Sequence, residues 1–481
     1  MMYKIDWEKY LSCDRYRVSQ FEKRKKDGNG EFRSAFESDY GRVIFSSAIR
    51  RMHDKTQVMP LSTGDSVHTR LTHSLEVMSI AYSLGIALCR DIDFLETYGD
   101  NAFQYERDIS IILKTAALVH DIGNPPFGHF GETIIQNYFK KYLEKRRITD
   151  EQALDFICFD GNAQGFRILT RLQYLGDLAG LNLTYATLAA YTKYPNNGKI
   201  DEKYIGRKKH GVFTSENEIL QEMADKCNLK NDDGSYKRHP LSFLVEAADT
   251  ISYNIMDIED GLSMGWYRFD DIVNFIKNEY GDKYENLNKQ LNIDQIQQKY
   301  YNNESHEFDE KGQMSALRVS IIFRQVNKAI KTFKENLQAI DEGTYSKELL
   351  DDGDELSKVL GKFATKYIFP NKQIELIELT GHSVITGLLD KLLFYAFDAD
   401  KKIRNRFKSV ISDSAIRVVM HTKDNEIKQQ DYKYYPKNDI LLFDFGDVDE
   451  YLRLRAVVDF VSGMTDKYAV SLYQKLSGLK L

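Results

Sequence analysis

The sequence predicts an all-α protein with few short β-strands. Apolar residues recur at helical spacing through most of the 481 residues, and β-like runs are few. Only 7 prolines are present, so little interrupts long helices. A chain of this length exceeds what one compact core accommodates, and we therefore expect two or three packed subdomains.

The composition argues against several classes of protein. The formal net charge of -6 gives no global basic field, which disfavours a nucleic-acid coat protein but allows a local basic pocket. The 4 cysteines are scattered and form no CxxC pair, so we expect reduced thiols in the cytoplasm. The N-terminus lacks an apolar signal core, and no apolar run approaches the roughly 20 residues that cross a bilayer. A membrane is therefore not an expected partner.

Four regions follow one another along the chain. The charged residues 1–35 are expected to form an N-terminal arm, and residues 36–270 form the main body, a run of helical patterns with short breaks. Residues 271–400 hold charged amphipathic helices. Residues 401–481 are expected to form a C-terminal helical region with a short strand segment.

Local patterns place individual elements within these regions. One helix is expected to start at Thr69-Arg70, because apolar residues follow at helical spacing, and another at Pro240, since proline suits the first helical position. The run Ile440–Phe445 predicts a strand, and a final helix is expected over about Val448–Leu476.

One short segment carries the densest chemistry in the chain. Ile111–Val119 is apolar enough to be a buried helix, and His120-Asp121 ends it. A polar pair at such a place must be satisfied by hydrogen bonds or by a metal ion. A break of Gly and Pro follows, and then His129 and Glu132.

Residues from two other helices complete a candidate metal site. His73 and Asp249 each interrupt an apolar helical stripe, where a lone His or Asp is more commonly a satisfied core or capping residue. With His120 and Asp121 they supply two imidazoles and two carboxylates, which suit Mn²⁺, Fe²⁺, Mg²⁺ or Zn²⁺ and leave positions for water and phosphate oxygen. The order His … His-Asp … Asp resembles the HD-domain phosphohydrolase superfamily, and these four residues match its ligands in order.

The flanking residues resemble a narrower family, the deoxynucleoside triphosphate triphosphohydrolases, which includes bacterial dGTP triphosphohydrolases. The similar segments are 50–58, 69–77, 120–132, 246–261 and 462–466. The run Gly-Asn-Pro-Pro-Phe-Gly-His-Phe-Gly-Glu is the most specific, because the wider superfamily requires none of it. The resemblance implies a helical HD-domain fold for residues 36–270, and a substrate-pocket and oligomer region for residues 271–400.

The resemblance also implies an activity. The expected reaction cleaves between the α-phosphorus and the 5′ oxygen of a deoxynucleoside triphosphate, with dGTP the favoured substrate, and gives a deoxynucleoside and inorganic triphosphate. Such a reaction needs a divalent metal at the α-phosphate and an acid–base group. His129 is the expected acid–base residue, or the group that places the attacking water. Glu132, three residues on, is expected to orient its ring.

Four residues are expected at the sugar and base. Gln57 and Val58 match a family pair that lies beside them. Tyr253 would pack against the C2′ side of the ribose, where a 2′-hydroxyl would clash, and Asp257 would accept a bond from the 3′-hydroxyl. Asp249, Tyr253 and Asp257 are four residues apart and so project from one helix face.

Cations are expected at the triphosphate. Arg70 lies one turn before His73 and should share its face. Lys193 and Tyr194 follow from their position in the family pattern, and Arg455 is a third candidate. A Lys or Arg side chain is more commonly solvated at the surface.

Two alternatives stay open. One is another HD-domain phosphodiesterase or nucleotidase, and the other is a regulatory HD protein that binds nucleotides or single-stranded nucleic acid without catalysis. The resemblance implies a homo-oligomer, either a hexamer or a tetramer, and it allows an allosteric nucleotide and single-stranded nucleic acid as partners. The metal and the preferred base cannot be derived from the residues.

Overall fold

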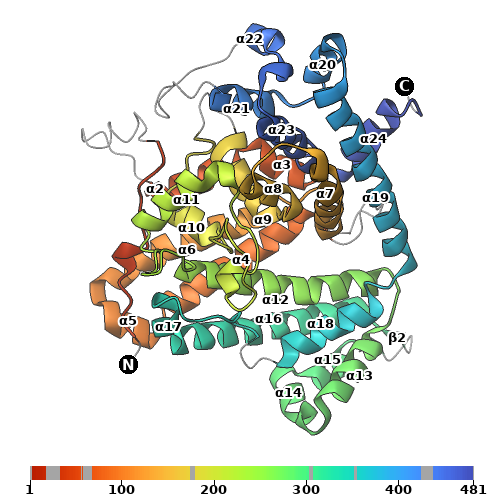
Figure 1. Cartoon of the computed structure of the whole chain (residues 1–481). Helices are drawn as coiled ribbons and strands as arrows, with labels where there is room; N and C mark the ends of the chain where they lie inside the picture. Colours follow the sequence, from red (N-terminus) through yellow and green to blue (C-terminus); the bar gives the residue numbers. More distant parts are fainter. Residues whose placement is uncertain are drawn as a thin grey trace.

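The computed structural model of this chain is almost entirely helical (Figure 1). It describes residues 3–17, 33–55, 57, 68–173, 179–302, 307–351, 355–423 and 437–479. Within them the only strands are the antiparallel pair β1 (Tyr301–Asn302) and β2 (Glu307–Phe308). The predicted all-α fold with few short strands is confirmed.

The helices run through the whole described chain. Those up to residue 263 are α2 (Ala35–Ile44), α3 (Ser47–Met52), α4 (Arg70–Cys89), α5 (Ile92–Tyr98), α6 (Ala102–Val119), α7 (Gly128–Tyr142), α8 (Asp150–Ile157), α9 (Gly161–Arg167), α10 (Tyr185–Tyr191), α11 (Asn217–Lys226) and α12 (Pro240–Ser263). Those that follow are α13 (Phe269–Tyr280), α14 (Tyr284–Leu291), α15 (Ile293–Lys299), α16 (Glu310–Glu335), α17 (Leu337–Asp341), α18 (Glu355–Tyr367), α19 (Lys372–Leu393), α20 (Lys401–Lys408), α21 (Asp413–Lys423), α22 (Lys437–Leu442), α23 (Glu450–Ser462) and α24 (Asp466–Leu476). Short 3-10 or π segments are η1 (Trp7–Lys9), η2 (Gly99–Asn101), η3 (Leu143–Lys145), η4 (Ile168–Leu172), η5 (Ile205–Arg207), η6 (Thr214–Glu216), η7 (Gly281–Lys283), η8 (Phe394–Asp398) and η9 (Phe445–Asp447).

The first hydrophobic core surrounds α4, which packs against α6 and α12. The two predicted helix starts are confirmed: the Thr69 side chain caps α4 by accepting from the Thr72 backbone N–H, and Pro240 is the first residue of α12. Trp7 and Tyr10 are buried in the same core, so this part of the N-terminal arm is packed onto the body. From the sequence we expected no apolar run long enough to cross a membrane, but α4 is long and apolar enough to do so. In this structure α4 packs inside the first core.

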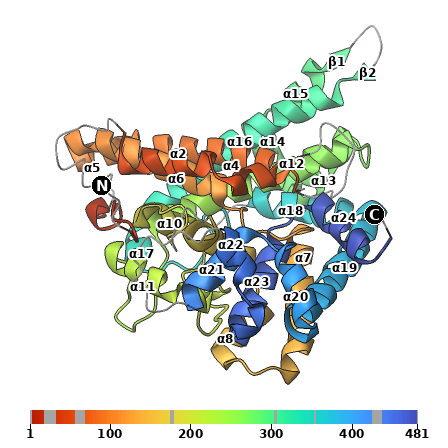
Figure 2. The same cartoon turned by 90° about the horizontal axis from the view of Figure 1, so that it is seen from above.

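Two further cores complete the molecule. The second core joins α7, α8, α19, α21 and α23, and the C-terminal helices in blue lie above the orange and yellow ones in Figure 1. The third core joins the C-terminal half of α12 to α13, α14, α16 and α18. Beyond α15, the β1–β2 pair projects from the body (Figure 2). Each core draws on more than one of the four predicted regions, whose boundaries stay a prediction.

The predicted strand Ile440–Phe445 is wrong. Ile440 lies in α22, and Phe445 opens η9; both side chains are buried in the second core. A short apolar run does not distinguish a strand from a helical turn, and packing decides here. The final helix is also two helices, because the chain breaks at Gly463 and Thr465 caps α24.

Candidate active site

Three helices bring two imidazoles and a carboxylate to one point. His73 lies in the first turns of α4, His120 caps the C-terminal end of α6, and Asp249 lies in α12. Oδ1 of Asp249 is 3.2 Å from Nε2 of His73 and 3.4 Å from Nε2 of His120. One ligand atom of each residue lies within 4.8 Å of the other two, so all three can reach one metal ion.

His120 is oriented as a metal-ligating histidine is. Its Nδ1 lies 2.7 Å from the Ala117 carbonyl oxygen, and its Nε2 is buried without a hydrogen bond to the described residues. Ligating imidazoles commonly fix their tautomer through such a carbonyl. Burial lowers the pKa of His120, but Asp121 and Asp249 outweigh it and raise the pKa to about 9. Positive charge is therefore favoured here, and the donor set fits a divalent cation.

Asp121 lies beside this cluster. Its Oδ1 is 3.6 Å from Nε2 of His120 and accepts a 2.8 Å hydrogen bond from the Asn124 side-chain amide. Its Oδ2 is 2.5 Å from Nη1 of Arg70. Burial raises the pKa of Asp121, but Arg70 and the two imidazoles hold it below its usual range. The carboxylate is therefore ionised, and its place as fourth metal ligand stays a prediction.

A sharp turn separates this cluster from α7. Phe127 and Gly128 both adopt a left-handed backbone, with φ of 62° and 59°. A Cβ atom at Gly128 would lie 2.5 Å from Nη2 of Arg70, so both its positive φ and the close approach of Arg70 favour glycine. The turn starts α7 at Gly128 and brings His129 to the same cavity as Arg70.

His129 and Glu132 form a hydrogen-bonded pair on α7. Nδ1 of His129 is 2.9 Å from Oε2 of Glu132, and Oε1 of Glu132 accepts a 2.7 Å bond from the Gly161 backbone N–H. The Glu132 side chain is 6% exposed and that of His129 is 76% exposed. The hydrogen bond that His129 donates to Glu132 raises the pKa of His129. A buried carboxylate thus holds an imidazole that projects into open space.

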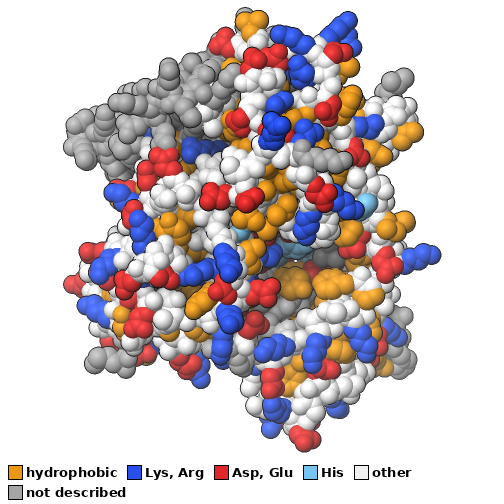
Figure 3. Space-filling model, in the orientation of Figure 1, with side chains coloured by type: hydrophobic (Ala, Val, Ile, Leu, Met, Phe, Trp, Pro, Cys, Tyr) orange, Lys and Arg blue, Asp and Glu red, His pale blue; other side chains and the backbone are white. Residues whose placement is uncertain are grey.

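One cavity of about 460 Å³ collects most of the predicted site. The predicted residues that line it are Gln57, Arg70, Asp121, His129, Lys193, Asp249, Tyr253 and Asp257. In Figure 3 a hollow near the middle of the face exposes histidine atoms between hydrophobic side chains. Side chains from α4, the 120–129 segment and α12 therefore meet in one pocket, although they are far apart in the sequence.

Other predicted residues lie elsewhere. Tyr194 is buried beneath Lys193, whose Nζ is 5.7 Å from its ring centre, and it does not line the cavity. Arg455 is fully buried in the second core, 3.0 Å from Asp459 and 3.9 Å from the ring centre of Phe213, so the structure places it in a core ion pair and not at the cavity. Val58 lies outside the described residues.

An apolar wall was not predicted from the sequence. It consists of Phe127, Phe130, Phe369, Ile374 and Ile377, with Thr250 and Glu378 beside them. Phe127 and Phe130 belong to the motif already singled out, and their aromatic character was the available signal. Phe369 precedes α19, and Ile374 and Ile377 lie in the first turns of this ordinary amphipathic helix. Only the tertiary fold brings these residues to the pocket.

The environment of Asp257 is unusual for a carboxyl group. It lines the cavity but is buried, and Asp260 lies nearby on the same helix. Burial, followed by repulsion from Asp260, raises the pKa of Asp257 to about 8. Near neutral pH its carboxyl group is therefore largely protonated and can donate as well as accept a hydrogen bond.

The fold and this site define the chain as an HD-domain phosphohydrolase. The HD domain model matches residues 70–156, which include His73, His120 and Asp121. The phosphohydrolase-associated domain model matches residues 443–475. A relative from Listeria monocytogenes, named deoxyguanosinetriphosphate triphosphohydrolase-like protein, is 34% identical over 99% of this chain and 100% of its own. Relatives with the same name from Pseudomonas aeruginosa and Synechocystis sp. are each 32% identical, over 98% and 99% of this chain and 99% and 100% of their own. The chain belongs to the deoxyguanosinetriphosphate triphosphohydrolase-like family.

Proposed function

We propose that this protein is a metal-dependent deoxynucleoside triphosphate triphosphohydrolase that favours dGTP and releases deoxyguanosine and inorganic triphosphate. One observation carries the proposal: a single cavity holds the edge of the His/Asp cluster, an imidazole bound to a buried carboxylate, two cations and several aromatic side chains. The name shared by the relatives supports dGTP as the substrate.

His73, His120 and Asp249, with Asp121 beside them, would hold a divalent ion such as Mn²⁺, Mg²⁺ or Fe²⁺. When bound, such an ion neutralises charge at the α-phosphate and lowers the pKa of a water molecule. Arg70 and Lys193 add positive charge to the same cavity, where the remaining phosphates need it.

His129 supplies the proton for the leaving 5′ oxygen. Because Nδ1 is bonded to Glu132, Nε2 is left to face the substrate. The raised pKa keeps more of the imidazole protonated near neutral pH, and a protonated Nε2 donates to the oxygen on which charge develops. Glu132 is buried behind His129 and orients the ring without contacting substrate.

Tyr253 and Asp257 give the preference for a deoxyribose. They follow Asp249 at intervals of four on α12, so the ribose lies along the same helix face as the reacting phosphate. A bulky ring at C2′ excludes a hydroxyl, and the Asp257 carboxyl group bonds the 3′-hydroxyl.

Glu378 gives the preference for guanine. It lines the cavity beside the wall formed by Phe369, Ile374 and Ile377, and desolvation raises its pKa. Guanine carries two adjacent donors on its Watson–Crick edge, and a carboxylate accepts both. The apolar side chains contact the faces of a flat base.

The test is the identity of the products. Purified protein is incubated with dGTP and Mn²⁺ or Mg²⁺, and the phosphorus products are identified by ³¹P NMR. Inorganic triphosphate is expected. Pyrophosphate or phosphate indicates a different HD-domain phosphohydrolase, and binding without turnover indicates a regulatory protein. Cytoplasmic location, a hexamer or tetramer, and control by a nucleotide or single-stranded nucleic acid stay predictions.

A further inference from the structure

A residue of the C-terminal segment binds the backbone of the turn at Phe127 and Gly128, which precedes His129. Asp466 is the first residue of α24 and is 2% exposed. Its Oδ1 accepts a 2.9 Å hydrogen bond from the Phe127 backbone N–H, a contact between residues 339 positions apart. This bond joins the segment 443–475, matched by the phosphohydrolase-associated domain, to the turn that precedes His129.

Phe127 needs such support because of its conformation. It has φ of 62° and ψ of 19°, a left-handed backbone that a bulky L-residue rarely adopts. Its ring packs so closely on α19 that a Cβ atom at Gly381 would lie 2.8 Å from the Phe127 Cγ. The ring is therefore fixed by α19 and the amide by α24, and His129 follows two residues later.

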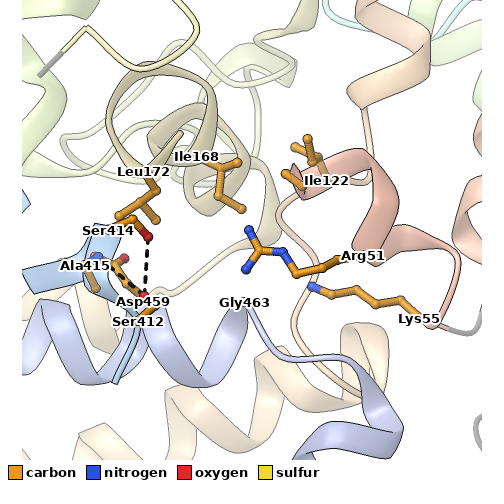
Figure 4. Close-up of a pocket in the computed structure, with 11 residues that line it drawn as sticks. Arg51, Lys55, Ile122, Ile168, Leu172, Ser412, Ser414, Ala415, Asp459 and Gly463 are labelled. Atoms are coloured by element: carbon orange, nitrogen blue, oxygen red, sulfur yellow. Dashed lines mark hydrogen bonds between the residues drawn. The ribbon is translucent and has the colours of Figure 1, made fainter. Parts of the chain in front are cut away.

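A second contact ties the same loop to the same C-terminal segment. The buried Lys55 ammonium donates to the Asn124 carbonyl oxygen at 2.5 Å and to the Ser462 carbonyl oxygen at 3.0 Å. Figure 4 shows Lys55 beside Arg51, next to the chain at Gly463. The loop between the metal cluster and His129 is thus anchored near both of its ends.

We propose that Asp466 is a positioning residue for His129. By binding the Phe127 amide it maintains the left-handed turn and so fixes the direction in which His129 enters the cavity. Asp466 does not line the cavity, so it acts through the backbone and not on the substrate. This inference rests on the proposed role of His129 in triphosphate release.

The test compares three substitutions of Asp466. Asp466→Ala removes the acceptor, Asp466→Glu displaces it by one methylene, and Asp466→Asn keeps an amide oxygen in its place. Ala and Glu are expected to lower kcat by about 10- to 100-fold, as misplacement of a catalytic group does, with KM and bound metal nearly unchanged. Asp466→Asn is expected to keep kcat close to the wild-type value, although it removes the charge.

Two further measurements separate positioning from general stability. In a His129→Ala background, Asp466→Ala should change kcat by less than about twofold, because the geometry it protects is already lost. Hydrogen exchange of the backbone over residues 125–132 should be faster in the Ala variant but not in the Asn variant. Asp449→Ala is the matched control, because it removes the cap of α23 without touching the turn.

The outcomes are distinct. An undiminished kcat in folded Asp466→Ala, an equal loss in the His129→Ala background, or loss of bound metal overturns the positioning role. If Asp466→Ala does not fold, the Glu and Asn variants decide. If the wild type releases no triphosphate, the proposed function fails, while the exchange comparison still tests whether Asp466 holds the turn.

Discussion

Nδ1 of His129 lies 2.9 Å from Oε2 of Glu132, so a buried carboxylate sets the orientation of an exposed imidazole. The other carboxylate oxygen is occupied by the Gly161 N–H, which leaves Glu132 little freedom to turn. In this pair His129 faces the cavity, and Glu132 is shielded from solvent. This division of roles leads to the first prediction.

Removal of His129 should affect chemistry and spare the metal. We expect His129→Ala to lower kcat by a factor on the order of 10²–10⁴ with unchanged metal content, measured by steady-state kinetics and elemental analysis. His53→Ala, which removes an exposed histidine, is the control. A near-normal kcat in His129→Ala would remove this residue from the mechanism.

Glu132 should set the pH range of activity. A bond to Glu132 raises the pKa of His129, so the protonated acid persists to higher pH, and activity falls as pH rises through that pKa. Glu132→Gln should therefore move the alkaline limb of the kcat profile to lower pH. An unmoved limb would show that another group titrates there.

Metal binding should depend on the clustered residues. Mn²⁺ at 100 times its Kd should stabilise the wild type by about 2.7 kcal/mol, seen as a rise in Tm. His120→Ala and Asp249→Ala should show no such rise, whereas His382→Ala on the exposed face of α19 should behave as wild type. A full metal-dependent rise in both cluster variants would place the ion elsewhere.

Tyr253 should exclude ribonucleotides. Tyr253→Ala opens the C2′ side, and we expect the kcat/KM ratio of GTP to dGTP to rise about 10- to 100-fold. Tyr253→Phe keeps the ring and should keep the exclusion. If both variants reject GTP as strongly as the wild type, the 2′-hydroxyl is excluded by other side chains.

Glu378 should select guanine. The Gln side chain of Glu378→Gln cannot accept hydrogen bonds from both adjacent donors of guanine. The ratio of kcat/KM for dGTP to that for dATP should therefore fall on the order of 10-fold to 10²-fold. Glu375→Gln, an exposed neighbour on α19 outside the cavity, is the matched control. An unchanged ratio in Glu378→Gln would assign the base preference to the apolar wall.

Local sequence signals predicted the parts of this protein that depend on spacing. The starts of α4 and α12 follow from Thr69 and Pro240, and the His129–Glu132 contact follows from their separation by three residues. Features set by tertiary packing could not be predicted this way. Arg455 was expected at the triphosphate but is buried beside Asp459, because α23 lies inside the second core.

The cavity wall illustrates the same limit. Phe369 and Glu378 are about 240 residues from His129, and nothing in the pattern around them distinguishes α19 from a surface helix. The apolar run at Ile440 was misassigned because six residues carry too little periodicity to separate strand from helix. Contacts between distant segments decide both cases.

The most direct test of the account is hydrolysis of dGTP in H₂¹⁸O with mass spectrometry of both products. Attack at the α-phosphorus predicts unlabelled deoxyguanosine and inorganic triphosphate that carries one ¹⁸O atom. Release of dGMP with pyrophosphate, or of dGDP with phosphate, would contradict triphosphate release by this site. Label in the deoxyguanosine would contradict cleavage between the α-phosphorus and the 5′ oxygen.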